Sequence, residues 1–196
     1  MRKMITVKIN GEERQYPQGA TYEDVANDYQ QEYENLIALA ARDGKIRELF
    51  KKLTRDCEVT FFTLKDDVGN KTYVRSATML FLKAVFDVCG REAAQGCRVE
   101  FAIGNGSYIS PKGKINATEE NAAKIRNRMR ELVEAKTPFL KRSYSLDNAM
   151  ELFRKEGMKD KEKLFRYRRG SFVNIYEMDG YYDYYYGYML PNAGYV

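Results

Sequence analysis

Hydrophobic and polar residues alternate at the start of the chain. Ile5, Val7 and Ile9 occupy every second position, so they lie on one face of a predicted strand. The dipeptide Asn10-Gly11 follows at once and favours the positive φ angles of a tight hairpin turn. The pattern therefore predicts a β-hairpin at the beginning of the fold.

Helical spacing replaces this alternation in the next segment. Thr21, with Asp24 three residues later, is typical of a helix N-cap, and Val25, Ala26 and Tyr29 would form the buried side of the helix. The remaining elements predicted here are strands over residues 36–41 and 58–64, with a turn at Asp43-Gly44. A short polar link over residues 65–70 should follow.

The second part of the chain mixes long helical patterns with short strands. The first helix, over residues 73–89, has a predicted core stripe of Val74, Ala77, Phe81, Ala84, Val85 and Val88. A second helix follows Thr118. The other predicted elements are strands 98–103 and 107–110 with a turn at Gly104-Asn105-Gly106, helices 146–156 and 160–167, and a closing hairpin of strands 172–176 and 181–188. The pattern indicates an α+β fold.

Tyrosines are concentrated in the closing hairpin. Six of them fall between residues 181 and 188. Strand alternation would place residues 182, 184, 186 and 188 on one face and residues 181 and 185 on the other. We weigh base stacking against plain sheet packing and favour packing, because tyrosine fits half-buried sheets without needing a ligand.

Composition is that of a folded protein that stays in water. The 196 residues are 44% hydrophobic and 31% charged, which excludes disordered and fibrous classes. No apolar run approaches the ~20 residues needed to cross a bilayer, and the chain shows no signal-peptide core. We expect a cytoplasmic protein without a membrane partner.

Residue counts also exclude much chemistry. The chain has no histidine, so histidine-based hydrolytic triads and histidine metal sites are absent. Its three cysteines, Cys57, Cys89 and Cys97, form no Cys-x-x-Cys pair. We expect no metal site, no disulfide framework and no cofactor in this part of the chain.

Positive charge is unevenly distributed. Residues 1–66 carry 11 basic and 12 acidic residues, whereas residues 67–196 carry 22 basic and 16 acidic ones, so a polyanion would be drawn to the second part. The candidate phosphate or RNA contacts are Lys124 and Arg128 on one helix, with neighbouring Arg126 and Arg130, and Arg166, Arg168 and Arg169 beside Tyr167. The alternative is a solvated surface on which glutamate and aspartate interrupt the basic residues, and we favour this alternative.

The first 66 residues resemble a known family. The matching stretches are residues 7–11 (Val-Lys-Ile-Asn-Gly), 22–26 (Tyr-Glu-Asp-Val-Ala) and 40–45 (Ala-Ala-Arg-Asp-Gly-Lys). They resemble the TGS domain, a ubiquitin-like β-grasp found in threonyl-tRNA synthetases, certain GTPases and stringent-response enzymes. The resemblance implies a β-grasp domain over residues 1–66 that interacts with RNA or a ligand and performs no catalysis.

Residues 67–196 resemble the domain that follows this module in threonyl-tRNA synthetases and hydrolyses mischarged tRNA. The motifs lie at residues 75–80, 103–108 and 144–153, and at Gly187, Pro191, Asn192 and Gly194. This is the synthetases' second additional domain, an α+β editing domain. The chain stops where that family continues, so we expect a domain truncated at its C-terminal end.

The resemblance places an editing cleft at four positions whose chemistry has changed. In that family two histidines on the first helix and a cysteine and histidine in the last hairpin form the cleft; the corresponding residues here are Arg75, Met79, Tyr185 and Met189. None supplies an unperturbed base near neutral pH. We expect a degenerate cleft that binds a ligand and has no catalytic residue.

A third resemblance suggests a parent protein. Residues 75–81, 163–169 and 185–191 resemble uridine-kinase-like nucleoside kinases of bacteria, which carry TGS and editing-like regions ahead of a P-loop kinase domain. No Gly-x-x-x-x-Gly-Lys-Ser/Thr motif occurs here, so a kinase domain with its ATP and magnesium would lie beyond residue 196.

Three functional hypotheses follow from these resemblances. The favoured one is a non-catalytic regulatory or RNA/nucleotide-recognition region of such a kinase, with tRNA, other RNA or a nucleotide and the kinase domain as partners. The alternative is a threonyl-tRNA-synthetase-like aminoacyl-tRNA deacylase. A dimerisation or spacer role, which includes a homo-oligomer, is the third.

Overall fold

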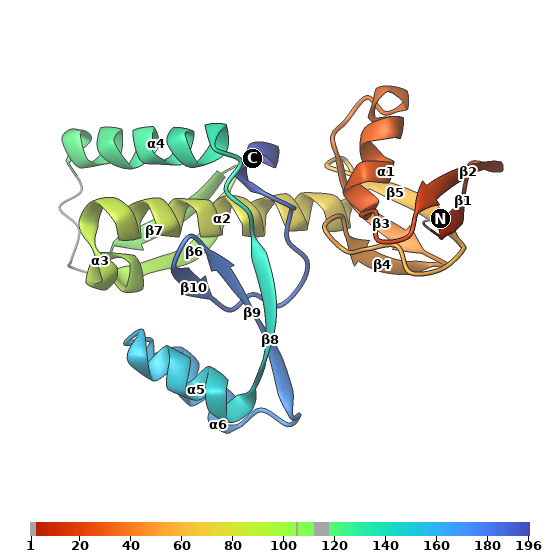
Figure 1. Ribbon diagram of the computed structural model, residues 1–196. Helices are drawn as coiled ribbons and strands as arrows, with labels where there is room; N and C mark the ends of the chain where they lie inside the picture. The colour runs from red at the N-terminus through yellow and green to blue at the C-terminus, as the bar shows by residue number, and fades with distance from the viewer. Residues whose placement is uncertain (1–2, 105, 112–117) are drawn as a thin grey trace. The chain divides into compact units, whose positions relative to one another are not determined.

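A computed structural model describes residues 3–104, 106–111 and 118–196 (Figure 1). The chain divides into two compact units, and each is described by itself. The first unit contains residues 1–77 and 186–196, and the second contains residues 78–185. The prediction of a mixed α+β fold is confirmed, because helices and several sheets alternate along the chain.

The first unit is built on a five-stranded sheet. Its strands are β1 (Met4–Ile9), β2 (Glu12–Pro17), β3 (Ile37–Arg42), β4 (Lys45–Glu48) and β5 (Cys57–Thr63). They lie in the order β2-β1-β5-β3-β4, and the central pair β1 and β5 is parallel. Two of the strand pairs, β1 with β2 and β3 with β4, are antiparallel hairpins closed by tight turns, and β5 joins these two hairpins into one sheet.

Helix α1 (Tyr22–Tyr29) contributes its apolar side to the core of this sheet (Figure 1). The predicted N-cap is confirmed: the Thr21 hydroxyl accepts a hydrogen bond from the Asp24 amide over 3.1 Å, and the Asp24 carboxylate accepts one from the Thr21 amide. Val25 and Tyr29 are buried among the strand residues. A short 3-10 turn, Gln30–Glu32, ends the helix.

Helix α2 (Asp67–Cys89) begins earlier than the sequence suggested. The link predicted over residues 65–70 is therefore wrong. The Asp66 carboxylate accepts a hydrogen bond from the Thr63 amide over 2.7 Å, which turns the chain directly into the helix. At Gly69 an added Cβ would lie 1.9 Å from the Thr63 carbonyl oxygen, so this helical position requires glycine.

The buried side of α2 also differs from the predicted stripe. Val74 is 43% exposed, whereas Thr72, Ser76 and Met79 are fully buried. The prediction followed the apolar residues, but the hydroxyls of Thr72 and Ser76 enter the interior by bonding to helix carbonyls one turn earlier. Ala84 and Val85 of the predicted stripe are buried as expected.

The second unit combines the rest of α2 with two small sheets and four further helices within the described residues. The bounds are α3 (Arg91–Gly96), β6 (Cys97–Ile103), β7 (Gly106–Pro111), α4 (Glu119–Glu134), β8 (Leu140–Ser145), α5 (Leu146–Lys155), α6 (Lys159–Arg166), β9 (Phe172–Met178) and β10 (Tyr181–Asp183). Strands β8, β9 and β10 form one antiparallel sheet, and β6 pairs with β7. The predicted turn at Gly104-Asn105-Gly106 includes Asn105, which lies outside the described residues.

The tyrosine-rich hairpin is shorter than predicted. Strand β10 ends at Asp183, because the Asp183 carboxylate accepts a hydrogen bond from the Tyr184 amide over 2.6 Å and draws the backbone out of the ladder. The predicted alternation of tyrosines over residues 184–188 is therefore wrong. Strands β4 and β8 and helix α3 were not predicted at all.

Candidate functional site

Arg75 and Met189, two of the four predicted cleft residues, lie in the first unit. The Arg75 Nε donates a hydrogen bond to the Tyr188 carbonyl oxygen over 3.1 Å. At Gly187 an added Cβ would lie 2.7 Å from the Arg75 Cζ, so the guanidinium requires a glycine beside it. Arg75 therefore anchors the segment 186–196 to helix α2.

Met189, in the same segment, is buried in the first unit. The Leu190 amide donates to the Ser76 hydroxyl over 2.9 Å, and the Met189 amide donates to the Glu48 carboxylate over 3.3 Å. Met189 and Leu190 are fully buried. Met189 is thus a core residue of the first unit, held by backbone hydrogen bonds on either side.

Met79 and Tyr185, the other two cleft residues, lie in the second unit. Met79 is 0% exposed, and the Tyr185 hydroxyl is buried. Burial, and then the nearby Asp183 carboxylate, raise the pKa of Tyr185 well above its usual value. Tyr185 therefore stays protonated at neutral pH and does not act as a base there.

A buried charged cluster occupies the β10 end of the same hairpin. Asp183 is 3% exposed and forms an ion pair with Lys161 of α6. Its carboxylate also accepts a hydrogen bond from the Tyr181 hydroxyl over 3.3 Å. Burial, and then the charge of Asp183, raise the pKa of Tyr181. This cluster ties α6 to the sheet, and the sequence interpretation did not identify Lys161 or Asp183.

Two of the predicted phosphate contacts lie on helix α4, where carboxylates contact them. Lys124 pairs with Glu120 over 2.7 Å, one turn earlier on the helix. This contact lowers the pKa of Glu120. Arg128 forms ion pairs with Glu131 over 2.9 Å and with Asp87 of α2 over 2.8 Å.

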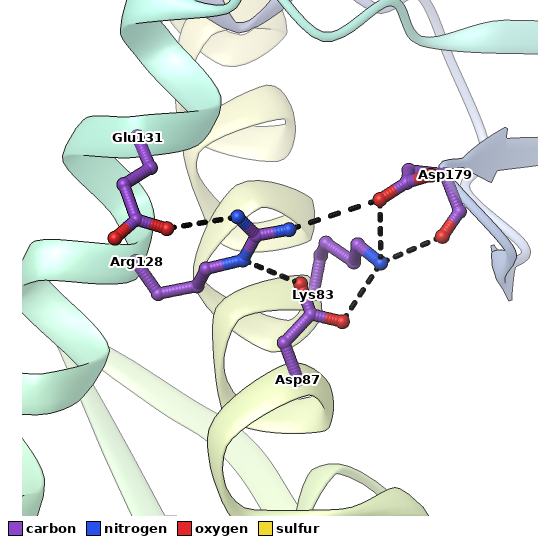
Figure 2. A network of polar contacts seen from close by, with 5 residues as sticks. All are labelled: Lys83, Asp87, Arg128, Glu131 and Asp179. Atoms are coloured by element: carbon purple, nitrogen blue, oxygen red, sulfur yellow. Dashed lines mark hydrogen bonds and ion pairs between the residues drawn. The ribbon is translucent and has the colours of Figure 1, made fainter.

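Figure 2 shows that Arg128 belongs to a network that joins three elements. Lys83 of α2 donates to the Asp87 carboxylate over 2.8 Å and to the Asp179 carbonyl oxygen over 2.6 Å. Asp179 lies in the turn between β9 and β10, and its carboxylate lies 3.8 Å from the Arg128 Nη2. The charge of Arg128 is therefore shared among three carboxylates.

Lys83 is the residue of this network that the sequence interpretation missed. Its side chain is only 3% exposed, although lysine is rarely buried without a partner. The available signal was a single lysine between Leu82 and Ala84 in an apolar run, with Asp87 four residues later. Such a placement is typical of a buried, paired cation.

The remaining candidate contacts lie around the end of α6. Arg166 pairs with Glu162 over 3.3 Å, and Glu162 also pairs with Arg154. The hydrogen bond from Arg154, and then those from Arg166, lower the pKa of Glu162. The Arg168 guanidinium lies 5.4 Å from the centre of the Tyr184 ring and donates to its hydroxyl. No carboxylate pairs with Arg168 or exposed Arg169 among the described residues.

Two further features are absent from the described residues. No helix in the described part of the chain has the length and apolar character needed to span a bilayer. No three histidine, cysteine, aspartate or glutamate side chains gather in a way that would bind a metal ion in residues 3–104, 106–111 and 118–196.

Comparison with known proteins identifies relatives along almost the whole chain. The threonine–tRNA ligase of Thermotoga neapolitana is 28% identical over 201 residues, which cover 99% of this chain and 30% of the relative. The enzyme of that name in Maricaulis maris is 27% identical over 194 residues, covering 97% and 30%. The one in Porphyromonas gingivalis is 25% identical over 193 residues, covering 95% and 28%.

These relatives make the chain similar to one region of a threonyl-tRNA synthetase. The chain spans about three tenths of the length of the curated relatives it matches. No model of a known protein family matches it.

The favoured hypothesis of a kinase-associated region is therefore wrong. The relatives that match nearly the whole chain are threonine–tRNA ligases. The short arginine-, phenylalanine- and tyrosine-rich stretches at residues 75–81, 163–169 and 185–191 are a weaker signal than similarity along the whole chain. The comparisons favour the alternative, synthetase-like hypothesis.

Proposed function

We propose that this chain is an aminoacyl-tRNA-binding region of the threonyl-tRNA-synthetase type. In this proposal residues 1–66 form a TGS β-grasp domain and residues 67–196 form an editing-like α+β domain. The similarity to threonine–tRNA ligases over 95–99% of the chain carries the proposal. This similarity to a region of tRNA-charging enzymes supports tRNA as the ligand in this proposal.

The architecture of the first unit supports the β-grasp assignment. Its strand order, β2-β1-β5-β3-β4, places a parallel pair in the middle of an otherwise antiparallel sheet. A single helix, α1, follows the first hairpin and packs against that sheet. This hairpin–helix–strand arrangement is the one that the sequence resemblance implies.

The chemistry of the four cleft positions argues against rapid hydrolysis. Ester hydrolysis near neutral pH needs a group that activates water. Arg75 stays protonated and contacts backbone oxygen, and Met79 and Met189 are buried thioethers. Tyr185 has a raised pKa. None of the four therefore serves as a general base in this arrangement.

Deacylation by a rebuilt site is the second candidate, and one observation favours it. Asp183, at the end of β10 and two residues before Tyr185, forms a buried ion pair with Lys161 of α6, close in sequence to the position where the synthetase family has its cysteine. A carboxylate and an ammonium group in a water-poor environment are the kind of pair that performs acid–base chemistry. This candidate predicts that Asp183→Asn abolishes hydrolysis while tRNA binding persists.

One experiment separates the two candidates. The 196-residue protein is titrated into threonine-specific tRNA, uncharged or carrying a non-cognate amino acid, at two salt concentrations. Binding that weakens with salt, without faster release of the amino acid, is the expected result, because phosphate contacts release counterions. Accelerated release supports deacylation instead. Absence of binding at the lower salt concentration contradicts both candidates.

A further inference from the structure

The segment that runs from the last turn of α6 to the first residue of β9, residues 163–172, combines exposed aromatic side chains with unbalanced positive charge. Tyr167 is 87% exposed and Phe172 is 67% exposed, which is unusual for rings of this size. The segment contains four basic residues and no acidic one. We call it the 163–172 surface. It connects the helix to the first strand of the hairpin (Figure 1).

Few carboxylates neutralise this surface. Glu162 is shared between Arg154 and Arg166, so one negative charge faces two positive ones. Arg168 contacts the Tyr184 ring and hydroxyl, which leaves its charge uncompensated. A surface with this excess attracts phosphate groups.

Buried aromatic rings pack against one another next to the 163–172 surface. Phe165 is 1% exposed and lies 5.4 Å from Phe153 and 5.0 Å from Tyr184, measured between ring centres. Tyr184 in turn contacts Arg168. The end of α6 is therefore fixed by aromatic packing, so the backbone next to Tyr167 is positioned before a ligand binds.

We propose that the 163–172 surface binds single-stranded RNA, with unpaired bases stacking on Tyr167 and Phe172 and the arginines contacting the backbone. Exposed aromatic rings beside basic side chains are the combination that single-stranded nucleic acids require, whereas a duplex keeps its bases stacked internally. The proposal rests on the proposed function, because it assigns the unpaired end of tRNA to this surface.

Basic residues near a helix C-terminus have a competing explanation. Lys163 and Arg166 lie in the last turn of α6, where positive charge interacts favourably with the helix dipole. This explains neither exposed ring, and it does not involve Arg169, which lies beyond the helix. The helix-dipole explanation therefore gives Tyr167 and Arg169 no role, whereas RNA binding requires both.

The test uses two variants with matched controls. Tyr167→Ala removes an exposed ring, and its control is Tyr186→Ala, because Tyr186 is also 87% exposed and lies in the first unit. Arg169→Gln removes an exposed charge, and its control is Arg130→Gln on α4. Affinity for a short single-stranded RNA, for a duplex RNA of equal length and for tRNA is measured by fluorescence anisotropy. Circular dichroism confirms that each variant is folded.

Tyr167→Ala is expected to weaken single-stranded RNA and tRNA binding about tenfold, with duplex binding unchanged. Arg169→Gln should reduce the slope of log affinity against log salt by about one. Neither control should have these effects. If tRNA binds and the two test variants match their controls, the surface assignment is wrong and the proposed function stands.

The same measurements also distinguish failure of the proposed function from failure of the surface assignment. If the wild type does not bind tRNA but binds single-stranded RNA through Tyr167, the proposed function fails and the surface assignment stands. Binding of neither RNA contradicts both. A Tyr167→Ala variant that weakens duplex and single-stranded binding equally also contradicts base stacking.

Discussion

Helix α4 and the 163–172 surface both carry clustered arginines and lysines, and the two regions differ in what these cations contact. On α4, Lys124 pairs with Glu120, and Arg128 is surrounded by Glu131, Asp87 and Asp179. On the 163–172 surface the basic residues outnumber the available carboxylates, and aromatic rings lie beside them. The first arrangement stabilises the fold, and the second is suited to a polyanionic ligand.

The largest expected effect tests the support of the 163–172 surface. Phe165→Ala removes a buried ring between Phe153 and Tyr184 and should lower the free energy of unfolding by about 3–5 kcal/mol. The control Phe172→Ala removes an exposed ring and should change stability by less than about 0.5 kcal/mol. Urea denaturation measures both. Equal effects would show that the two rings do not differ in packing as described.

A second variant tests the network on α2 and α4. Lys83→Met removes a buried cation from between Asp87 and Asp179 and should cost about 3 kcal/mol of stability. Lys71→Met is the control, because Lys71 forms an exposed i,i+4 pair with Asp67 that should be worth less than about 0.5 kcal/mol. RNA affinity should be unchanged in both variants. A loss of RNA binding in a folded Lys83→Met protein would contradict the assignment of this network to stability alone.

Replacing one glutamate by glutamine in each region compares the two surfaces directly. Glu162→Gln releases Arg154 and Arg166 from their shared carboxylate and should strengthen RNA binding about threefold at low salt, because one negative charge is lost beside the phosphates. Glu120→Gln releases Lys124 on α4 in the same way and should leave RNA affinity unchanged. Anisotropy titrations compare the two. A similar gain in both would indicate a response to net charge alone.

The smallest effect is expected on acidification. The pKa values of Glu120 and Glu162 are lowered from 4.5 by their basic partners, so each ion pair contributes stability above that pH. The contribution disappears as the pH falls through the lowered values. Glu120 is 77% exposed, and the Glu162 side chain is 13% exposed but its partners Arg154 and Arg166 are 64% and 60% exposed, so solvent screens both ion pairs and the effect is small. The melting temperature of Glu162→Gln should depend less on pH below about 4.5 than that of the wild type.

Local signals in the sequence predicted local structure well. Asn10 and Gly11 have φ angles of 52° and 89°, as the hairpin turn requires, and the Thr21 N-cap forms as expected. Strand β8 was missed because its sequence, Leu-Lys-Arg-Ser-Tyr-Ser, has no apolar alternation. It exists through pairing with β9, where Arg142 lies opposite Ile175. Pairing between strands this far apart in sequence cannot be predicted from the few residues of one strand.

The same limit explains the candidate site. The sequence identified the basic residues of both regions, but pairing decides which of them keep their charge for a ligand. One of the carboxylates that bind Arg128 belongs to Asp87, 41 residues earlier in the chain. The exposure of Tyr167 depends equally on how α6 packs. Neither relation follows from spacing along one element.

The attachment of segment 186–196 to the first unit has a consequence for biosynthesis. The hydrogen bonds from Met189 to Glu48 and from Asn192 to Glu23 span 141 and 169 positions. Once β5 has been translated, all residues of the five-stranded sheet have been synthesised. Residues 186–196, which pack against the first unit, are then still to be translated. Contacts between such distant positions form slowly. The first unit therefore cannot complete its folding until segment 186–196 has been synthesised.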